Sequence, residues 1–483
     1  MAAPAPVAPG DSALFRRVWR WHFYAGLVCL PFLVLLAVTG GLYLFKEPIE
    51  ALLYAPLREV APPRAGVLDA QTLVALALAA EPGDAVRYVA PAAPGRSAEV
   101  GVRTAGAGVV AVYLDPADGR VLGRLPDAQR LMELVKRLHS LAIAGAVANH
   151  LVEVVAGWAI VLVLSGVFLW WPRGRPGSVL RVQGRPAQRR WWRDLHALTG
   201  SVAAVAILFL AVTGLPWSAF WGERFGQLSA AWGLGVAPYV WGPPPPSSSA
   251  PPLAGLTAVP WALGQVPVPV SSAPAAGAGG AAAGGHAGHA GDAGSGVDAP
   301  APATTSTAPR PAFGLNDALE RIAAAGLPAG TPVRLPAGPR GAYSALHFPD
   351  DVRGIRVLHL DRHTGAVLAD VGYADYGALG RATEWGISLH TGRQFGAANQ
   401  AVMLAACVSI VMLAVSAAVM WWKRRPAGRL AAPPRRAGDR AAAGAIAVAV
   451  LLGGLYPLLG ASMLLALAVD ALVPARWRER LGL

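Results

Sequence analysis

Apolar residues along this 483-residue chain gather into long runs instead of alternating with polar residues. A membrane-spanning helix needs about 20 predominantly apolar residues, and four runs meet this length: roughly 23–45, 151–171, 195–217 and 401–422. A fifth run, 441–473, would form a helix about 50 Å long, against a hydrocarbon core of about 30 Å. We expect a break near Gly453–Pro457 to fold it into a hairpin, which favours six spans over five.

Basic residues mark one side of the predicted spans. Three arginines precede the first span, seven lie between Arg173 and Arg193, and seven Lys or Arg residues lie between Lys423 and Arg440. By contrast, Glu223–Glu384 carries 9 arginines against 11 acidic residues. Cytoplasmic loops are enriched in Lys and Arg, so this segment is predicted to be translocated. Orientation in a membrane thus explains the net charge of +13, and no nucleic-acid partner is expected.

The two regions outside the membrane have similar patterns. "LDAQTLVALALAAEPGDAVRYV" predicts a helix followed by extended chain, and "VVAVYLDPADGRVLGRL" predicts two strands around a turn. After the third span, "LNDALERIAAAGLPAG" and "IRVLHLDRHTGAVLADV" repeat this order. An Ala/Gly/Pro tract ending near Pro311 predicts a disordered linker. Its His286 and His289 are expected to be solvated, with weak copper or nickel capture as the alternative.

The repeat extends into the membrane segments and includes four histidines. The spacing is 17 residues for His22–Thr39 and His196–Thr213, and 31 residues for His139–Trp170 and His390–Trp421. The chain is therefore predicted to be a tandem duplication of one unit. Each unit contains a span outward, an extracytoplasmic domain, a histidine and a span back.

Topology places these histidines in two pairs. His22 and His196 open outward-going spans, whereas His139 and His390 precede inward-going spans, so one pair is expected on each side of the membrane. Polar groups at the hydrocarbon are costly unless they have partners, and facing imidazoles between helices are how a b-type haem is held. We therefore predict two b-type haems with these four ligands. Interfacial histidines, a bare zinc or iron site, and a proton relay involving Glu153 are the alternatives.

Further residues are assigned around the predicted haems. Gly26 and Gly200 lie one turn after a histidine, where they would leave room for a porphyrin face. Cationic partners for the propionates are expected from Arg20 and Arg193 at the inner haem, and from Arg137 and Arg393 at the outer haem.

The remaining histidines and the cysteines are given other roles. His150 could replace His139 as a ligand, although the equivalent position in the second copy is Ala401. Cys29 and Cys407 both fall inside predicted spans, so no disulfide framework or thiolate metal site is expected. Surface positions are predicted for His347, His359 and His363.

Several motifs together resemble a known family. "LDPADGRVLG" and "LDRHTGAVLA" resemble the closing turn of PepSY domains, and "LVLSGVFLWWPR", "DLHALTG" and "EWGISLHTGRQFG" resemble membrane motifs of the PepSY-associated transmembrane family, also called iron-regulated membrane proteins. The resemblance covers most of residues 15–430 except the linker. It implies an inner-membrane di-haem protein similar to ferric-siderophore reductases, with His22, His139, His196 and His390 as haem ligands.

The expected fold class is a polytopic α-helical membrane protein with four core spans, a C-terminal apolar hairpin or kinked helix, and two small extracytoplasmic α+β PepSY-like domains. In order, its parts are 1–20 (cytoplasmic N-terminus), 21–45 (span), 46–138 (first PepSY-like domain), 139–172 (interfacial segment and span), 173–193 (basic loop), 194–218 (span), 219–311 (segment with the linker), 312–388 (second PepSY-like domain), 389–422 (interfacial segment and span), 423–440 (basic loop), 441–473 (C-terminal apolar region) and 474–483 (tail).

The expected function is that of an oxidoreductase in the lipid membrane. An unknown cytoplasmic or quinol donor would supply electrons, and a ferric siderophore or other ferric chelate outside would receive them. The alternative is a haem-free membrane anchor whose PepSY-like domains bind or regulate a peptidase, a sensor or a metal chelate.

Overall fold

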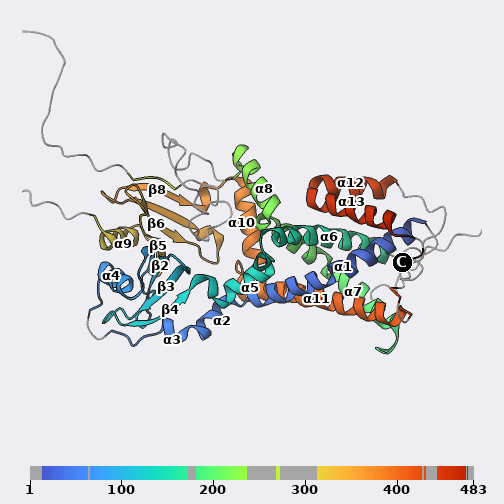
Figure 1. The fold of residues 1–483 in the computed structure, drawn as a ribbon, viewed down its shortest axis with the longest axis horizontal. Coiled ribbons are helices and arrows are strands. Elements are labelled where there is room, and N and C mark those ends of the chain that lie inside the picture. Colours follow the sequence, from blue (N-terminus) through green and yellow to red (C-terminus); the bar gives the residue numbers. More distant parts are fainter. Residues whose placement is uncertain are drawn as a thin grey trace, which may run out of the picture.

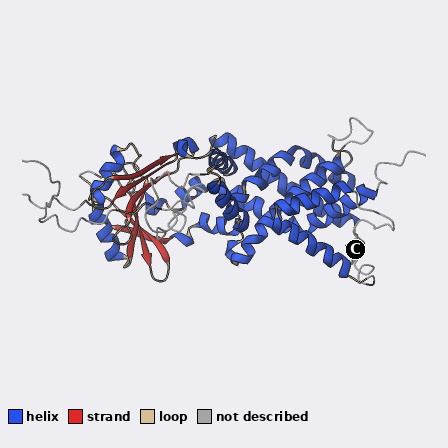
Figure 2. Ribbon diagram, turned by 90° about the horizontal axis from the view of Figure 1, so that it is seen from above, coloured by secondary structure: helices blue, strands red, loops and turns tan. Residues whose placement is uncertain are grey.

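The computed structural model describes residues 13–63, 66–171, 181–235, 268–271, 313–426, 429–430, 443–474 and 476. The molecule is elongated, with a β-sheet domain at one end and a bundle of long helices at the other (Figure 1). Short helices lie between the two, so the strands and the long helices occupy separate regions (Figure 2).

Four helices are long and apolar enough to cross a membrane, which confirms the four predicted spans. They are α1 (Ala13–Tyr43), α6 (Ala146–Trp170), α7 (Arg189–Thr213) and α11 (Gly396–Arg424). Helices α1 and α7 each contact both α6 and α11. The two helices that open the repeats, α1 and α7, therefore face each other diagonally across the bundle.

The C-terminal apolar region forms the predicted hairpin. Helix α12 (Ala443–Leu455) and helix α13 (Pro457–Leu472) meet at Tyr456, where the proline that follows opens α13. The hairpin packs on α6, with Leu459 filling the space beside Gly157 and Trp158 Nε1 donating to Ser462 Oγ at 3.0 Å. With 13 and 16 residues, both helices are shorter than the roughly 20 residues of a span. Among the described residues, only the four helices of the bundle reach spanning length, so the expectation of six spans is not supported.

The two copies of the repeat share one sheet instead of forming separate domains. The first copy provides α2 (Lys46–Leu53), α3 (Ala55–Arg58), α4 (Ala70–Ala80), β1 (Asp84–Val89), β2 (Ala98–Thr104), β3 (Gly108–Leu114) and β4 (Val121–Pro126). The second provides α9 (Leu315–Ala324), β5 (Pro332–Arg334), β6 (Ala342–His347), β7 (Arg356–Asp361) and β8 (Val367–Gly372). The strand order is β4-β3-β2-β1-β5-β6-β7-β8. Antiparallel pairing of β1 with β5 satisfies the edge that each four-stranded half would otherwise leave open.

Helices α4 and α9 cover the same face of this sheet. Leu73 and Ala77 of α4 pack on Val100 of the first half, and Ala318 and Ile322 of α9 pack on the second half. The two helices are joined at their N-termini by Asp69, which accepts hydrogen bonds from Thr72 N at 3.1 Å and Asn316 Nδ2 at 3.0 Å. One apolar core of the sheet domain thus lies under α4 and α9 and continues across the join. A second core, which includes Leu346 and Val357, lies against the opposite face of the second half.

Three short helices connect the sheet to the bundle: α5 (Leu131–His139), α8 (Ala219–Ala231) and α10 (Ala378–His390). The segment 219–311, expected to hold a disordered linker, therefore begins with a helix. Buried Glu153 of α6 holds α8 by accepting from Ser218 Oγ at 2.9 Å and Trp221 N at 3.1 Å. The linker histidines, His286 and His289, lie outside the described residues.

Candidate functional site

The structure brings His22 and His196 together inside the bundle. His22 lies on α1 and His196 on α7, the two diagonal helices, and their ring centroids are 6.4 Å apart with planes at 89°. The pairing predicted from the repeat is therefore present at this end of the bundle. The sequence of either helix alone does not predict this contact, because the two histidines are 174 positions apart in the chain.

Each of the four histidines has its Nδ1 atom beside a Ser or Thr hydroxyl of a neighbouring helix. The Nδ1–oxygen distances are 2.8 Å for His22 and Ser165, 2.9 Å for His139 and Thr39, 2.9 Å for His196 and Ser416, and 2.9 Å for His390 and Thr213. The same contact thus occurs four times, and the duplicated halves use the same residue type at equivalent places.

The hydroxyl groups determine which ring nitrogen carries the hydrogen. Each hydroxyl donates its single hydrogen to a carbonyl oxygen in the preceding turn of its own helix, at 2.6 to 3.0 Å. The pairs are Thr39 with Leu35, Ser165 with Val161, Thr213 with Phe209, and Ser416 with Leu413. It can then only accept from the imidazole. His196 Nδ1 also lies 3.2 Å from the carbonyl oxygen of Leu413, which cannot donate. This hydrogen-bond pattern assigns the hydrogen of all four rings to Nδ1 and the lone pair to Nε2, the arrangement that orients a histidine metal ligand.

These hydroxyl groups are functional candidates that the sequence analysis missed. Each one comes from the same half of the duplication as its histidine, whereas His22 and His196 meet across the halves. A signal was present: Ser165 and Ser416 both follow a repeat histidine, His139 or His390, by 26 residues. The threonines served only as markers of the repeat, because a hydroxyl in an apolar run gives no indication of the side chain it faces.

Glycines next to the hydroxyl residues make room for the imidazoles. A Cβ atom on Gly40 would lie 3.2 Å from Cε1 of His139, one on Gly166 would lie 3.2 Å from Cε1 of His22, and one on Gly214 would lie 3.6 Å from Cε1 of His390. The glycines chosen from the sequence have a different environment. Cβ atoms at Gly26 and Gly200 would make ordinary contacts with Leu162 and Leu413, at 3.8 and 3.5 Å. Their role beside a porphyrin stays a prediction.

The second pair lies at the end of the bundle nearest the sheet. His139 ends α5 and His390 ends α10, two helices at equivalent positions in the two halves. Burial, with a smaller effect of the neighbouring His139, lowers the pKa of His390 to about 3. Burial also lowers the pKa of His139. Both rings are therefore neutral at physiological pH.

The two pairs are separated along the bundle by most of the thickness of a membrane. His22 and Thr39, which holds His139, lie 17 residues apart on the same helix, or about 25 Å at the helical rise. A hydrocarbon core is about 30 Å thick. Each pair thus lies near one boundary of the apolar region.

Three of the four arginines predicted to contact propionates have protein partners. Arg20 lies over the ring of Tyr24 at 5.0 Å, and Arg193 pairs with Asp194 at 2.7 Å. Arg393 pairs with Asp350 at 2.9 Å. Arg137 lies on α5, two residues before His139. The propionate contacts stay predictions, and three of these arginines would have to share or exchange their present partners.

Other histidine predictions have mixed outcomes. His150 Nδ1 contacts the carbonyl oxygen of Ala146, one turn earlier on its own helix, at 2.9 Å. The prediction that His359 lies at the surface is wrong. Its side chain is completely buried in β7, and its Nδ1 lies 2.7 Å from Ser344 Oγ of β6. Strand β7 lies between β6 and β8, and Ser344 of β6 is the direct cross-strand neighbour of His359.

The chain matches a family of known membrane proteins. The family described as the PepSY-associated TM region matches residues 19–424, a range that includes all four paired histidines. The chain belongs to this PepSY-associated TM family. Among individually curated proteins, none matches the chain. The family match ends before the α12–α13 hairpin.

Proposed function

We propose that this PepSY-associated TM protein is a di-haem electron carrier of the bacterial inner membrane. One b-type haem would be held by His22 and His196, and a second by His139 and His390. Electrons would pass from a cytoplasmic or quinol donor to a ferric chelate on the periplasmic side. The proposal places the basic ends of the long helices in the cytoplasm and the sheet domain in the periplasm, following the positive-inside rule.

The observation that carries the proposal is the set of four identically oriented imidazoles. Each Nδ1–H donates to a hydroxyl oxygen, so each Nε2 has a lone pair available for iron. Two imidazole nitrogens that bind one metal ion from opposite sides at about 2.0 Å have ring centroids roughly 6.3 Å apart. The 6.4 Å between the His22 and His196 centroids fits this arrangement.

The surrounding residues fit a haem better than a bare metal ion. Within the described residues, no group of three or more His, Cys, Asp or Glu side chains is close enough to hold a metal ion. Two imidazoles are the complete protein ligand set of a six-coordinate haem, since the porphyrin supplies the other four nitrogens. Bound haem would supply a one-electron couple at each end of the bundle. The chain itself orients the imidazoles and excludes water with apolar helices.

The direct test is haem content. The purified full-length protein is expected to contain two b-type haems per chain and to show their absorption bands on reduction. Membrane vesicles should then reduce an external ferric chelate, one electron per Fe(III), when a donor is supplied inside. A protein without a reducible b-type signal, purified from cells that make haem, would instead favour the haem-free anchor.

The Thr213 hydroxyl is expected to hold the outer ligand in place. Thr213→Val keeps the size of the side chain but removes the acceptor for His390 Nδ1–H, and loss of such a partner weakens metal binding by about 10- to 100-fold. Haem should therefore dissociate faster from this variant, measured by transfer to an excess of apomyoglobin. Thr213→Ser, which keeps the hydroxyl, should restore retention.

Thr383 offers a matched control for this experiment. Its hydroxyl also donates to the preceding turn of its helix, to the Leu379 carbonyl at 2.8 Å, and it lies on α10, the helix that ends at His390. Thr383→Val should retain haem like the wild type. Equal retention by Thr213→Val and Thr213→Ser would show that the hydroxyl does not orient the ligand.

A further inference from the structure

Spanning helix α6 carries a buried carboxylate in its second turn. Glu153 is only 1% exposed. An ionisable side chain in a spanning segment is costly unless it has partners, and it is therefore a candidate for a functional role. Its partners belong to the other half of the duplication: Oε2 accepts from Ser218 Oγ at 2.9 Å and from Trp221 N at 3.1 Å.

These two contacts make Glu153 the cap of helix α8. Ser218 is the N-cap residue of α8, and Trp221 N belongs to its first turn, where backbone amides have no partner within the helix. The Ser218 hydroxyl makes no cap hydrogen bond of its own and donates to Glu153 instead. A carboxylate at this end of a helix also interacts favourably with the helix dipole. The position of α8 is therefore set by a side chain of α6.

The chain that leaves α8 in turn caps helix α10. The carbonyl oxygen of Leu234 accepts from Leu379 N and Gly380 N, both at 3.0 Å and both in the first turn of α10. A Cβ atom on Gly377, the N-cap residue of α10, would collide with the Leu234 oxygen, so a glycine is needed for this approach. Helix α10 ends at His390. Glu153 is thus connected through α8 to the helix that carries an outer histidine.

The path returns to His390 from the other side as well. Thr213, whose hydroxyl accepts from His390 Nδ1 at 2.9 Å, is the last residue of α7 and precedes Ser218 by five positions. A Cβ atom on Gly386 of α10 would lie 3.0 Å from Cγ2 of Thr213, so the two helices are also in close contact here. Helices α7, α8 and α10 therefore form a closed loop of contacts, and Glu153 fixes this loop to α6.

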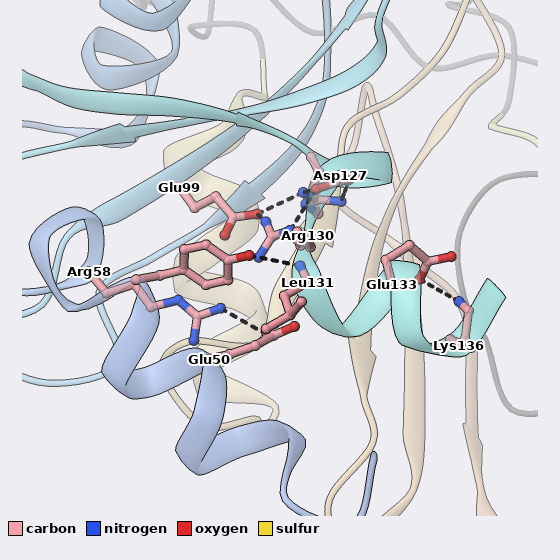
Figure 3. A network of polar contacts seen from close by, with 10 residues as sticks. Glu50, Arg58, Glu99, Asp127, Arg130, Leu131, Glu133 and Lys136 are labelled. Atoms are coloured by element: carbon pink, nitrogen blue, oxygen red, sulfur yellow. Dashed lines mark hydrogen bonds and ion pairs between the residues drawn. The ribbon is translucent and has the colours of Figure 1, made fainter. Parts of the chain in front are cut away.

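The first half of the chain has the same arrangement around its outer histidine. The Leu131 amide, the first of α5, donates to Tyr54 Oη at 2.8 Å (Figure 3), and α5 ends at His139. The end of α1 is held by the other half, because Gln400 Nε2 of α11 donates to the Leu44 carbonyl oxygen at 3.1 Å. In each half, the segment after the outward span contacts the returning span of the other half and caps the helix that ends at the outer histidine.

We propose that Glu153 is a positioning residue for the outer histidine pair: its carboxylate holds α8, and α8 fixes α10 and the His390 imidazole. The inference rests on the proposed function, since His390 is taken there as a haem ligand. Groups that hold a ligand without touching the metal orient it, and their loss weakens metal binding by about 10- to 100-fold.

The test compares two substitutions of Glu153 in the purified full-length protein. Glu153→Leu removes both acceptor contacts of α8, so the outer haem should dissociate about 10-fold faster, measured by transfer to apomyoglobin. The electron paramagnetic resonance signal of an oxidised haem depends on its axial ligands, so the outer signal should shift while the inner signal stays unchanged. Glu153→Gln keeps an oxygen acceptor for Ser218 and Trp221 and should restore the outer signal.

The inner haem is the internal reference for folding in this experiment. Its His22 and His196 ligands lie at the other end of the bundle and do not depend on α8. Equal changes in both haem signals of Glu153→Leu, or none in either, would overturn the proposal. A shift confined to the outer signal and reversed in Glu153→Gln would support it.

Ser218→Ala and Ser462→Ala form a matched pair. Each removes one side-chain hydrogen bond to α6: Ser218 Oγ donates to Glu153, and Ser462 Oγ accepts from Trp158 Nε1 at 3.0 Å. Ser462 lies on α13, which carries no histidine. Ser218→Ala should shift the outer signal in the same direction as Glu153→Leu, and Ser462→Ala should match the wild type. Shifts of the same size in both serine variants would refute the connection through α8.

Hydrogen–deuterium exchange tests the connection without haem. Loss of the cap should speed exchange in the part of α10 that contains Leu379 and Gly380, in haem-free as well as haem-containing protein. Unchanged exchange there in Glu153→Leu would overturn the proposal even if haem is bound. A wild type that contains no haem, with faster exchange in Glu153→Leu, would refute the electron-transfer function and leave the connection from Glu153 to α10 standing.

Discussion

Replacing His196 with alanine is expected to remove about half of the haem from the protein. The methyl side chain cannot replace the Nε2 lone pair that the Ser416 hydroxyl leaves available in the wild type, and His22 alone would hold its haem weakly. The remaining haem, between His139 and His390, should keep its spectrum. Haem per chain and the reduced-minus-oxidised absorption spectrum measure this, and vesicles should lose nearly all reduction of the external chelate.

His150→Ala provides the matched control for His196→Ala. His150 is also a partly buried histidine in a spanning helix, but its Nδ1 contacts the carbonyl oxygen of Ala146 on its own helix. It should leave both haems and the chelate reduction unchanged. If His150→Ala lost one haem and His196→Ala lost none, the assignment of ligands from the repeat would be wrong.

Replacing Glu99 with glutamine is expected to destabilise the sheet domain by about 3 kcal/mol, within the range observed when one partner of a buried ion pair is removed. Glu99 Oε1 accepts from Arg87 at 2.7 Å and from Arg130 at 3.3 Å, and its side chain is only 17% exposed. Without its charge, two buried guanidinium groups would share Asp127 alone. Hydrogen–deuterium exchange should therefore become faster in β2 and at the start of α5.

The same carboxylate gives a pH dependence with a defined sign. Burial alone would raise the pKa of Glu99, but Arg87 and Arg130 hold it below its usual value. The stabilisation is thus complete above the ordinary glutamate pKa of about 4.3 and is lost as the pH falls through the lower folded value. Glu99→Gln should lack this acid-dependent component.

Glu81→Gln is the control for Glu99→Gln. Glu81 pairs with Arg124 at 3.1 Å, but that arginine is 49% exposed, and exposed pairs contribute about 1 kcal/mol or less. Exchange in β2 should be unchanged in this variant. Similar exchange in the Glu99→Gln and Glu81→Gln proteins would indicate that the ion pairs of Glu99 with Arg87 and Arg130 do not stabilise the sheet.

Much of the architecture was predictable because membrane insertion leaves a strong pattern in the sequence. A span must be a continuous apolar helix, so the four long helices could be located before their contacts were known. The hairpin break near Gly453–Pro457 followed from excess length and from a proline that cannot continue a helix. The equal spacings of His22 and His196 to a threonine similarly indicated a duplication, and this predicted a pair that the structure brings to 6.4 Å.

Contacts between distant segments could not be predicted in the same way. Pairing of β1 with β5 depends on backbone groups, which are the same in every sequence, so two domains were expected where one sheet exists. His359 was placed at the surface because its own segment does not show that its side chain meets Ser344 of β6 in a buried position. The four hydroxyl contacts likewise depend on how the helices are rotated against one another, since a threonine such as Thr39 looks alike whether it faces lipid or an imidazole.

The sequence by itself thus determined the four spans, the duplication and the meeting of His22 with His196, because apolar length and spacing are properties of the chain. Only the tertiary structure decided which nitrogen of each imidazole is available and which glycines make room for the rings. It also decided that Glu153 of one half meets Ser218 and Trp221 of the other. Those features arise where side chains from separate segments meet, and the free energy of such contacts depends on distance and direction in space.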